Sequence, residues 1–241
     1  MYRYLERAGE WLLSKLYNPS HHEAHYRRVM QLRAAIRKLS GQSLTNTPQD
    51  GEPLYNQLVK ATGFDGTQRL LDFGCGTAGT GIHFACSMTC GHYIGADISQ
   101  NALAVAAQRL TDYHANNAAD LHYISKSEEI ATFGPVDIII AQSVFTHNPI
   151  ETLVVFLTAA KSCLSPDGLI AANFAIAETE DRISRTDYIY QTDKLETVVQ
   201  SCGYNLCKMD NWKHPSMAFR ARDAPQDTLY IFRRQSNEIS D

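Results

Sequence analysis

The sequence predicts an α/β fold in which helices cover both faces of a mostly parallel sheet and the last strand is antiparallel. Short apolar runs alternate with helical patterns over residues 69–174, which is typical of strand–helix–strand units. A glycine-rich turn, residues 74–81, follows the first of these runs. No helical pattern separates the last two strands, and a parallel crossover needs about a dozen residues that are usually helical. The chain should therefore end in an antiparallel hairpin.

Two amphipathic helices are predicted ahead of the sheet. Apolar residues recur at helical spacing over residues 4–16 and again over 23–39. A capping box at Ser20–Glu23 opens the second helix. His21 and His25 lie one helical turn apart there, a spacing that suits a metal ion or a phosphate. Because both fall in the first turn, we expect exposed side chains instead.

A polar stretch, residues 41–53, separates these helices from the rest of the chain. Pro53 is expected to start a short helix after it. We therefore predict an N-terminal helical cap with its linker at residues 1–52, a core domain at 53–235 and a disordered tail at 236–241.

Five parallel strands are expected in the core, at Arg69–Phe73, His92–Asp97, Leu121–Ser125, Val136–Ala141 and Leu169–Phe174. Ser99 should cap the helix after the second strand, and Asn148-Pro149 should open the helix after the fourth. Thr192 should cap the helix that leads into the hairpin strands, Tyr204–Asn211 and Thr228–Arg233.

The composition is that of an ordinary globular protein, with 44% hydrophobic and 20% charged residues. No apolar run is long enough to cross a membrane, and the first residues lack the apolar core of a secretory signal. We therefore expect a cytoplasmic protein with no membrane partner.

The net charge of −4 is unevenly spread, because residues 1–40 hold eight Lys or Arg against three Glu. That segment carries +5 and the remainder −9. An anionic partner is one explanation, but the basic residues are interleaved with apolar ones, which favours a solvated helical face. Nucleic acid is not expected, because the chain is acidic overall and has no basic stripe.

The six cysteines follow no metal-finger spacing, and we expect reduced thiols in the core: Cys75, Cys86, Cys90, Cys163, Cys202 and Cys207. Cys86 and Cys90 together with His83 and His92 are conceivable metal ligands, but no paired CxxC anchors them. No metal site is predicted.

Asp72 narrows the meaning of the glycine-rich turn. It lies in the first strand, two residues before the first glycine, where a dinucleotide site usually has apolar residues. The run Asp72–Gly79, with Asp97 after the next strand, resembles motif I and its acidic successor in class I S-adenosylmethionine-dependent methyltransferases. The resemblance extends weakly over residues 65–235. It implies a Rossmann-like, seven-stranded sheet and S-adenosylmethionine as the cofactor.

The resemblance also implies the cofactor contacts. The glycine loop would wrap the methionine part, with Asp72 facing its amino acid group and Gln142 closing that end. Asp97 is placed to accept both ribose hydroxyls. Lys126 and Ser127 fall at the adenine edge, with a serine where an aspartate is common in the family. The predicted cofactor residues are Asp72, Gly74, Cys75, Gly76, Thr77, Gly79, Asp97, Ile98, Lys126, Ser127 and Gln142.

Methyl transfer from a sulfonium is an in-line displacement, so alignment is its main requirement. His147 is the best candidate for a base, since histidine titrates near neutrality and this one follows the fourth strand. The alternative is a histidine that is hydrogen-bonded at the start of the next helix. The acceptor pocket is expected to use irregular segments on the same edge, with Tyr188, Tyr190, His214 and Arg220 as candidate substrate residues.

We therefore expect a methyltransferase that acts on a small molecule, with oxygen favoured over nitrogen as the acceptor. Two alternatives stay open: a non-catalytic S-adenosylmethionine-binding or scaffold protein, and an NAD(P)-dependent oxidoreductase. Asp72 and the terminal hairpin count against the oxidoreductase.

Overall fold

The computed structural model describes residues 22–39, 48–178, 181–182, 187–212 and 226–235. Its α-helices are α2 (His22–Leu39), α3 (Pro48–Thr62), α4 (Gly81–Cys86), α5 (Gln100–Asp112), α6 (Ile150–Cys163) and α7 (Thr192–Ser201). Its strands are β1 (Arg69–Phe73), β2 (His92–Asp97), β3 (Ala119–Tyr123), β4 (Val136–Ala141), β5 (Leu164–Ile176), β6 (Asp181–Arg182), β7 (Tyr188–Ile189), β8 (Tyr204–Lys208) and β9 (Gln226–Arg234). Three 3₁₀ helices complete it: η2 (Asn116–Ala118), η3 (Ser127–Thr132) and η4 (Phe145–His147).

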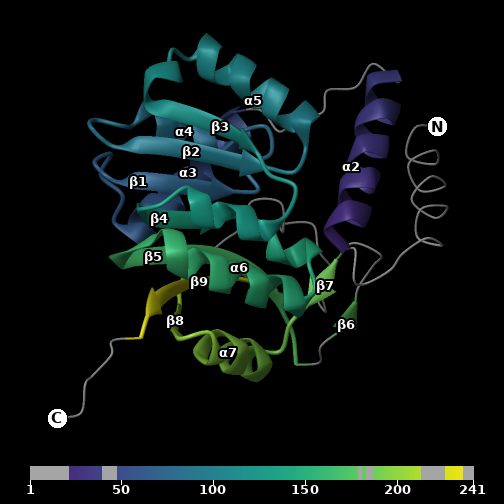
Figure 1. Ribbon diagram of the computed structural model, residues 1–241, viewed down its shortest axis with the longest axis vertical. Helices are drawn as coiled ribbons and strands as arrows, with labels where there is room; N and C mark the ends of the chain where they lie inside the picture. Colours follow the sequence, from purple (N-terminus) through teal and green to yellow (C-terminus); the bar gives the residue numbers. More distant parts are fainter. Residues whose placement is uncertain (1–21, 40–47, 179–180, 183–186, 213–225, 236–241) are drawn as a thin grey trace.

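The predicted seven-stranded sheet is confirmed, with the strand order β3-β2-β1-β4-β5-β9-β8 (Figure 1). Strands β1 to β5 are parallel, and β9 runs antiparallel to both β5 and β8. The chain runs outward from β1 to β2 and β3, and then crosses back to form β4 on the other side of β1. This reversal is the point at which parallel sheets bind ligands, at the carboxyl ends of the strands.

The side chains of β1 point alternately into two apolar layers, one on each face of the sheet. Leu71 and Phe73 belong to the layer beneath α6 and α7, whereas Leu70 belongs to the layer beneath α3 and α4. Successive side chains of a strand point to opposite faces, so Asp72 shares the face of Leu70. The glycine-rich turn therefore emerges with its acidic residue on the α4 side of the sheet.

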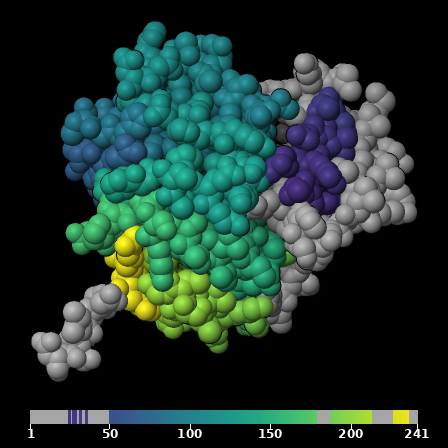
Figure 2. Space-filling view, in the orientation of Figure 1, coloured from purple at the N-terminus to yellow at the C-terminus, as the bar shows by residue number. Residues whose placement is uncertain are grey.

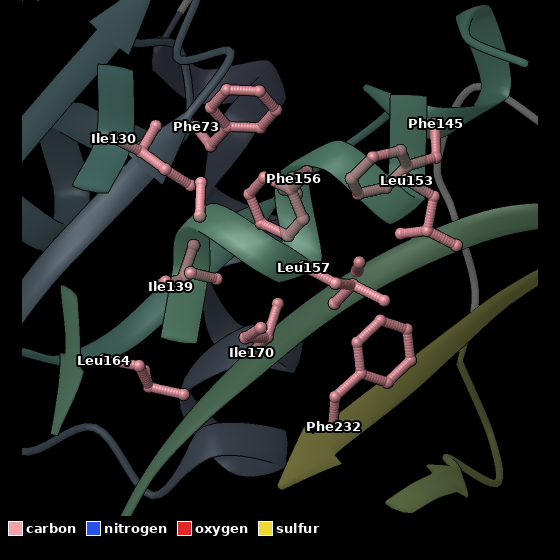
Figure 3. Packing of buried hydrophobic residues seen from close by; sticks show 14 of the residues in the cluster. Phe73, Ile130, Ile139, Phe145, Leu153, Phe156, Leu157, Leu164, Ile170 and Phe232 are labelled. Carbon is pink, nitrogen blue, oxygen red and sulfur yellow. The ribbon is translucent and has the colours of Figure 1, made fainter. Parts of the chain in front are cut away.

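The larger layer fixes the carboxyl edge of the sheet on the α6 side. Phe156 of α6 packs 4.7 Å from Phe73, ring centroid to centroid, and 5.1 Å from Phe145. Figure 3 shows these rings and the α6 leucines facing the strand residues. Phe145 is fully buried and belongs to this layer. The contact between Phe145 and Phe156 therefore fixes the segment after β4 against α6.

Several element boundaries differ from the predictions because tertiary contacts decide them. Helix α3 begins at Pro48, with Pro53 inside it, so the helix start predicted at Pro53 is wrong. Strand β5 extends beyond the predicted Leu169–Phe174, because Leu164 pairs with β4 and the far end pairs with β9. Strand β3 starts earlier, at Ala119, where it pairs with β2. The division into domains stays a prediction.

The predictions for helix termini and for histidine exposure are confirmed only in part. Ser99 caps α5 as predicted, its hydroxyl accepting from the Ala102 N–H at 3.2 Å. Gln191, not Thr192, is the N-cap residue of α7. His25 is only 6% exposed, so its predicted exposure is wrong; it shares one stripe of α2 with buried Val29, four residues on. His21 and the predicted helix at 4–16 lie outside the described residues.

The cysteines are free, as expected, but they do not all lie in the core. Cys75 and Cys163 are buried, whereas Cys86, Cys90 and Cys207 are exposed. Within the described ranges, no helix combines the length and apolarity that a membrane crossing requires. No group of three or more acidic, histidine or cysteine side chains in those same ranges could hold a metal ion.

Candidate active site

The glycine loop after β1 leaves its backbone bare at two positions. Gly74 and Gly76 have φ angles of +76° and +55°, which favour glycine. A side chain at Gly74 would begin 2.5 Å from Cγ2 of Val144, so this glycine is needed for packing. At Gly76, by contrast, no atom of the described residues other than its chain neighbours lies within 4 Å of the place where a side chain would begin. The loop thus presents open space beside Gly76 to a ligand.

Asp97, at the end of β2, holds this loop in place. One carboxylate oxygen accepts from the Gly76 N–H at 2.8 Å, and the other accepts from the Ser99 N–H at 2.7 Å. The side chain is buried, and burial raises the pKa of this carboxyl while the two backbone donors lower it. The Ile98 N–H also donates to this carboxylate, which has about four lone-pair sites and can therefore still accept from a ligand.

Two contacts that the sequence did not suggest also brace the loop. Arg109 of α5 donates through Nη1 to the carbonyl oxygen of Thr77 at 2.8 Å and to its hydroxyl at 3.1 Å. Helix α3 crosses Gly79 so closely that a side chain at Gly51 would begin 2.2 Å from the Gly79 carbonyl oxygen. The predicted cofactor residues Thr77 and Gly79 are therefore held by neighbouring helices.

Asp72 lies beneath the loop in a tightly packed pair. Its Oδ2 accepts from the Tyr93 hydroxyl at 2.8 Å, and the carboxylate is 4% exposed. Burial raises the pKa of Asp72 to about 7, with the Tyr93 hydrogen bond opposing that rise and Asp97 adding to it. Cys75, buried alongside, has its thiol pKa raised by burial and by these two carboxylates. A nearby cation, such as a ligand ammonium group, would favour the charged form of Asp72.

We expect Gly81→Ala to destabilise the protein by about 1–3 kcal/mol, because the new methyl group would lie 2.0 Å from the Tyr93 hydroxyl oxygen. Tyr93→Phe removes that oxygen. In urea unfolding, the double variant should therefore lose less stability than the two single losses added together. Strict additivity would show that Gly81 and Tyr93 do not compete for the same space.

A pH dependence of stability follows from Asp72. Because its pKa is about 7 in the folded protein and 3.8 for an unperturbed aspartate, the folded state binds more protons between these values. Stability should fall as pH rises from about 4 to about 7, by at most about 1.4 kcal/mol per pH unit, and level off above. Asp72→Asn should flatten this part of the profile in thermal unfolding measured against pH. An unchanged slope in that variant would contradict the assignment.

At the predicted adenine side, Lys126 and Ser127 lie at the start of η3, shortly after the end of β3. Ser127 is 2% exposed, whereas Lys126 is exposed and precedes the first turn of η3. Ile98 is partly buried and packs on the larger apolar layer. The predicted cofactor residues therefore line up along the loops after β1, β2 and β3.

His147 is part of a histidine–aspartate pair after β4. Its Nδ1 lies 2.9 Å from Oδ1 of Asp187, and the two side chains are 31% and 39% exposed. Asp187 comes from the segment just before β7 and was not predicted, because no spacing in the sequence connects it with His147. A carboxylate at Nδ1 favours the tautomer with its proton there and a lone pair on Nε2.

Of the candidate substrate residues, Tyr190 does not lie on an open surface. It is 2% exposed, and its hydroxyl donates to the carbonyl oxygens of Phe145 and Asn148. This placement gives Tyr190 a packing role and does not support a substrate role. Tyr188 is partly exposed on β7, whereas His214 and Arg220 lie outside the described residues.

A chain of hydrogen bonds fixes the segment that carries Gln142. Gln142 donates through Nε2 to the Ser143 hydroxyl at 2.8 Å, and the Ser143 N–H donates to Oδ1 of buried Asn173 at 2.6 Å. Asp227 of β9 then accepts from Nδ2 of Asn173 and from Nε1 of Trp212, each at 2.7 Å. The segment after β8 and the start of β9 thus position the loop after β4, a connection the sequence pattern did not reveal.

Residues 71–170 match the family model described as "Methyltransferase domain". No curated protein sequence matches the chain significantly. Among solved structures, the magnesium protoporphyrin IX methyltransferase ChlM from Synechocystis PCC 6803 with bound S-adenosylmethionine has a TM-score of 0.61 and 16% identity, over 89% of this chain and 97% of that one. The [4+2]-cyclase SpnF has a TM-score of 0.67 and 14% identity, over 88% and 97%.

The strand order, the glycine loop with acidic residues on both sides, and the matched domain agree with one another. Residues 71–170 are therefore similar to a methyltransferase domain, and the chain shares the fold of ChlM, which was solved with bound S-adenosylmethionine.

Proposed function

We propose that this protein transfers a methyl group from S-adenosylmethionine to an oxygen atom of a small molecule, with His147 as the base. The observation that carries the proposal is the pair of His147 and Asp187, at 2.9 Å, in the segment that follows β4. This is the same sheet edge as the glycine loop, so a base there can reach an acceptor that faces the cofactor.

The residues present fit the cofactor. The open side of Gly76 and the bare loop backbone suit the methionine part, and buried Asp72 supplies a carboxylate near its ammonium group. The spare lone pairs of Asp97 suit the ribose hydroxyls. When bound, S-adenosylmethionine supplies an electrophilic methyl group on a sulfonium, which leaves as a neutral thioether.

An oxygen acceptor is favoured because a hydroxyl must lose its proton during the transfer. His147, held with its proton on Nδ1 by Asp187, can take that proton on Nε2. A neutral amine needs no base before attack, so a nitrogen acceptor would leave the pair without a task in that step. The partly exposed positions of His147 and Asp187 suit a small molecule that enters from solvent.

The proposal is tested by incubating the chain with methyl-labelled S-adenosylmethionine and a metabolite extract, then locating labelled products by mass spectrometry. Label on an alcohol or phenol oxygen is the expected result. Label on nitrogen alone would overturn the choice of acceptor. Binding of S-adenosylhomocysteine without transfer to any acceptor would favour a non-catalytic binding protein. This control is necessary because SpnF, a cyclase, has a similar fold.

A further inference from the structure

Arg27 fastens α2 to the sheet. Its Nη2 donates to the main-chain carbonyl oxygen of Ser125, just after β3, and its guanidinium carbon lies 5.9 Å from the centroid of the Tyr123 ring. In Figure 1, α2 stands across from the carboxyl ends of the parallel strands. Figure 2 shows its purple surface directly against the teal central part of the chain. One arginine thus connects the N-terminal helix with the end of β3.

The same guanidinium carries a buried donor that is not used. Nε of Arg27 has no hydrogen-bond partner among the described residues, although the atom is shielded from solvent. In the planar guanidinium, the Nε–H and one Nη2–H share an edge and point in nearly the same direction. Because Nη2 donates to the Ser125 carbonyl, the Nε–H lies on the same edge of the guanidinium as that hydrogen bond. A buried donor without an acceptor destabilises the structure that holds it, so an acceptor from a ligand would remove that penalty.

Ser125 itself lies next to the proposed adenosine site. Tyr123 is the register partner of Asp97, and the Ile124 N–H donates to the Asp97 carbonyl at 3.1 Å. Ser125 is therefore two residues beyond the position paired with the proposed ribose ligand. It directly precedes Lys126, at the predicted adenine edge.

We propose that Arg27 is a cofactor-binding residue whose Nε–H donates to a ring nitrogen of the adenine. The Ser125 carbonyl, which keeps a second lone pair, accepts from the adenine amino group beside it. Adenine presents a ring-nitrogen acceptor beside its amino donor, so it complements a protein donor that lies beside a protein acceptor. Helix α2 is then part of the cofactor site. This inference rests on the proposed cofactor placement.

The test is titration calorimetry of the full chain with S-adenosylhomocysteine. Arg27→Ala should weaken binding by about tenfold to a hundredfold, the loss expected for a hydrogen bond from a charged donor. Arg28→Ala is the matched control, because Arg28 is exposed on the same helix, and it should bind like the wild type. Arg27→Lys keeps the charge but not the paired donors, so it should not restore affinity.

S-inosylhomocysteine separates a direct contact from the docking of α2, because its base presents a carbonyl and an N–H where adenine has an amino group and an acceptor. The wild type should bind it more weakly than S-adenosylhomocysteine, and Arg27→Ala should narrow that gap. If Arg27→Ala fails to fold, as judged by circular dichroism, Arg27→Lys provides the same comparison.

Equal affinity of the wild type and Arg27→Ala for S-adenosylhomocysteine would overturn this inference alone. An equal fold-loss for both ligands would show that Arg27 only docks the helix, and would also overturn it. A wild-type chain that does not bind S-adenosylhomocysteine would overturn the proposed cofactor, and this inference with it.

Discussion

His147→Ala should lower kcat for methyl transfer by about 10²- to 10⁴-fold, the usual contribution of a positioned acid or base. Asp187→Asn should lower kcat less, because His147 would remain but lose the carboxylate at 2.9 Å that fixes its tautomer. Both variants should bind S-adenosylhomocysteine like the wild type, since neither residue belongs to the proposed cofactor site. Labelled-methyl transfer and calorimetry provide the two measurements.

The chain contains a matched control for this experiment. His92 and Asp120 form a second histidine–aspartate pair, 2.8 Å apart, near the amino ends of β2 and β3. His92→Ala removes the same chemistry from the opposite edge of the sheet and should keep full turnover. If His147→Ala also kept full turnover across the pH range, His147 would be a structural residue and the proposed base would be wrong.

Asp97→Asn should weaken S-adenosylhomocysteine binding by about a hundredfold. An amide keeps only one acceptor oxygen, so it cannot accept from both the Gly76 and the Ser99 N–H groups, which lie 2.8 and 2.7 Å from the two carboxylate oxygens. The ribose would also lose charge-assisted hydrogen bonds, each worth about 1.5–3 kcal/mol. Asp97→Asn should therefore disturb the conformation of the glycine loop and weaken the ribose contact at the same time.

Calorimetry checks this expectation against Asp112→Asn, which changes an exposed carboxylate at the end of α5. That control should bind S-adenosylhomocysteine normally. An Asp97→Asn variant with wild-type affinity would show that the ribose binds elsewhere, and would remove the basis for placing the adenine near Ser125.

Local patterns predicted the sheet because the signals there are local. The bounds of β1, β2 and β4 agree with the prediction, since continuous apolar runs mark strands that are buried on both faces. The glycine loop was recognisable for a similar reason: bare backbone at positive φ requires glycine at fixed positions. Capping of α5 by Ser99 also depends on near neighbours only.

Contacts between distant segments were not predictable in this way. Asp187 meets His147 across 40 positions, and the chain from Ser143 through Asn173 to Asp227 joins three separate elements. Neither contact leaves a spacing in the sequence, because its partners become neighbours only when strands pair. Tyr190 illustrates the converse, since an aromatic residue in a polar segment proved to be fully packed.

The sequence by itself determined the fold class, the position of the cofactor loop and the two acidic residues beside it, because each depends on residues close together in the chain. The tertiary structure alone decided which side chains brace that loop, which carboxylate accompanies His147 and where α2 docks. Those choices depend on contacts between distant parts of the chain. The register of β2 and β3 pairs Asp97 with Tyr123, and Arg27 of α2 then packs against the Tyr123 ring.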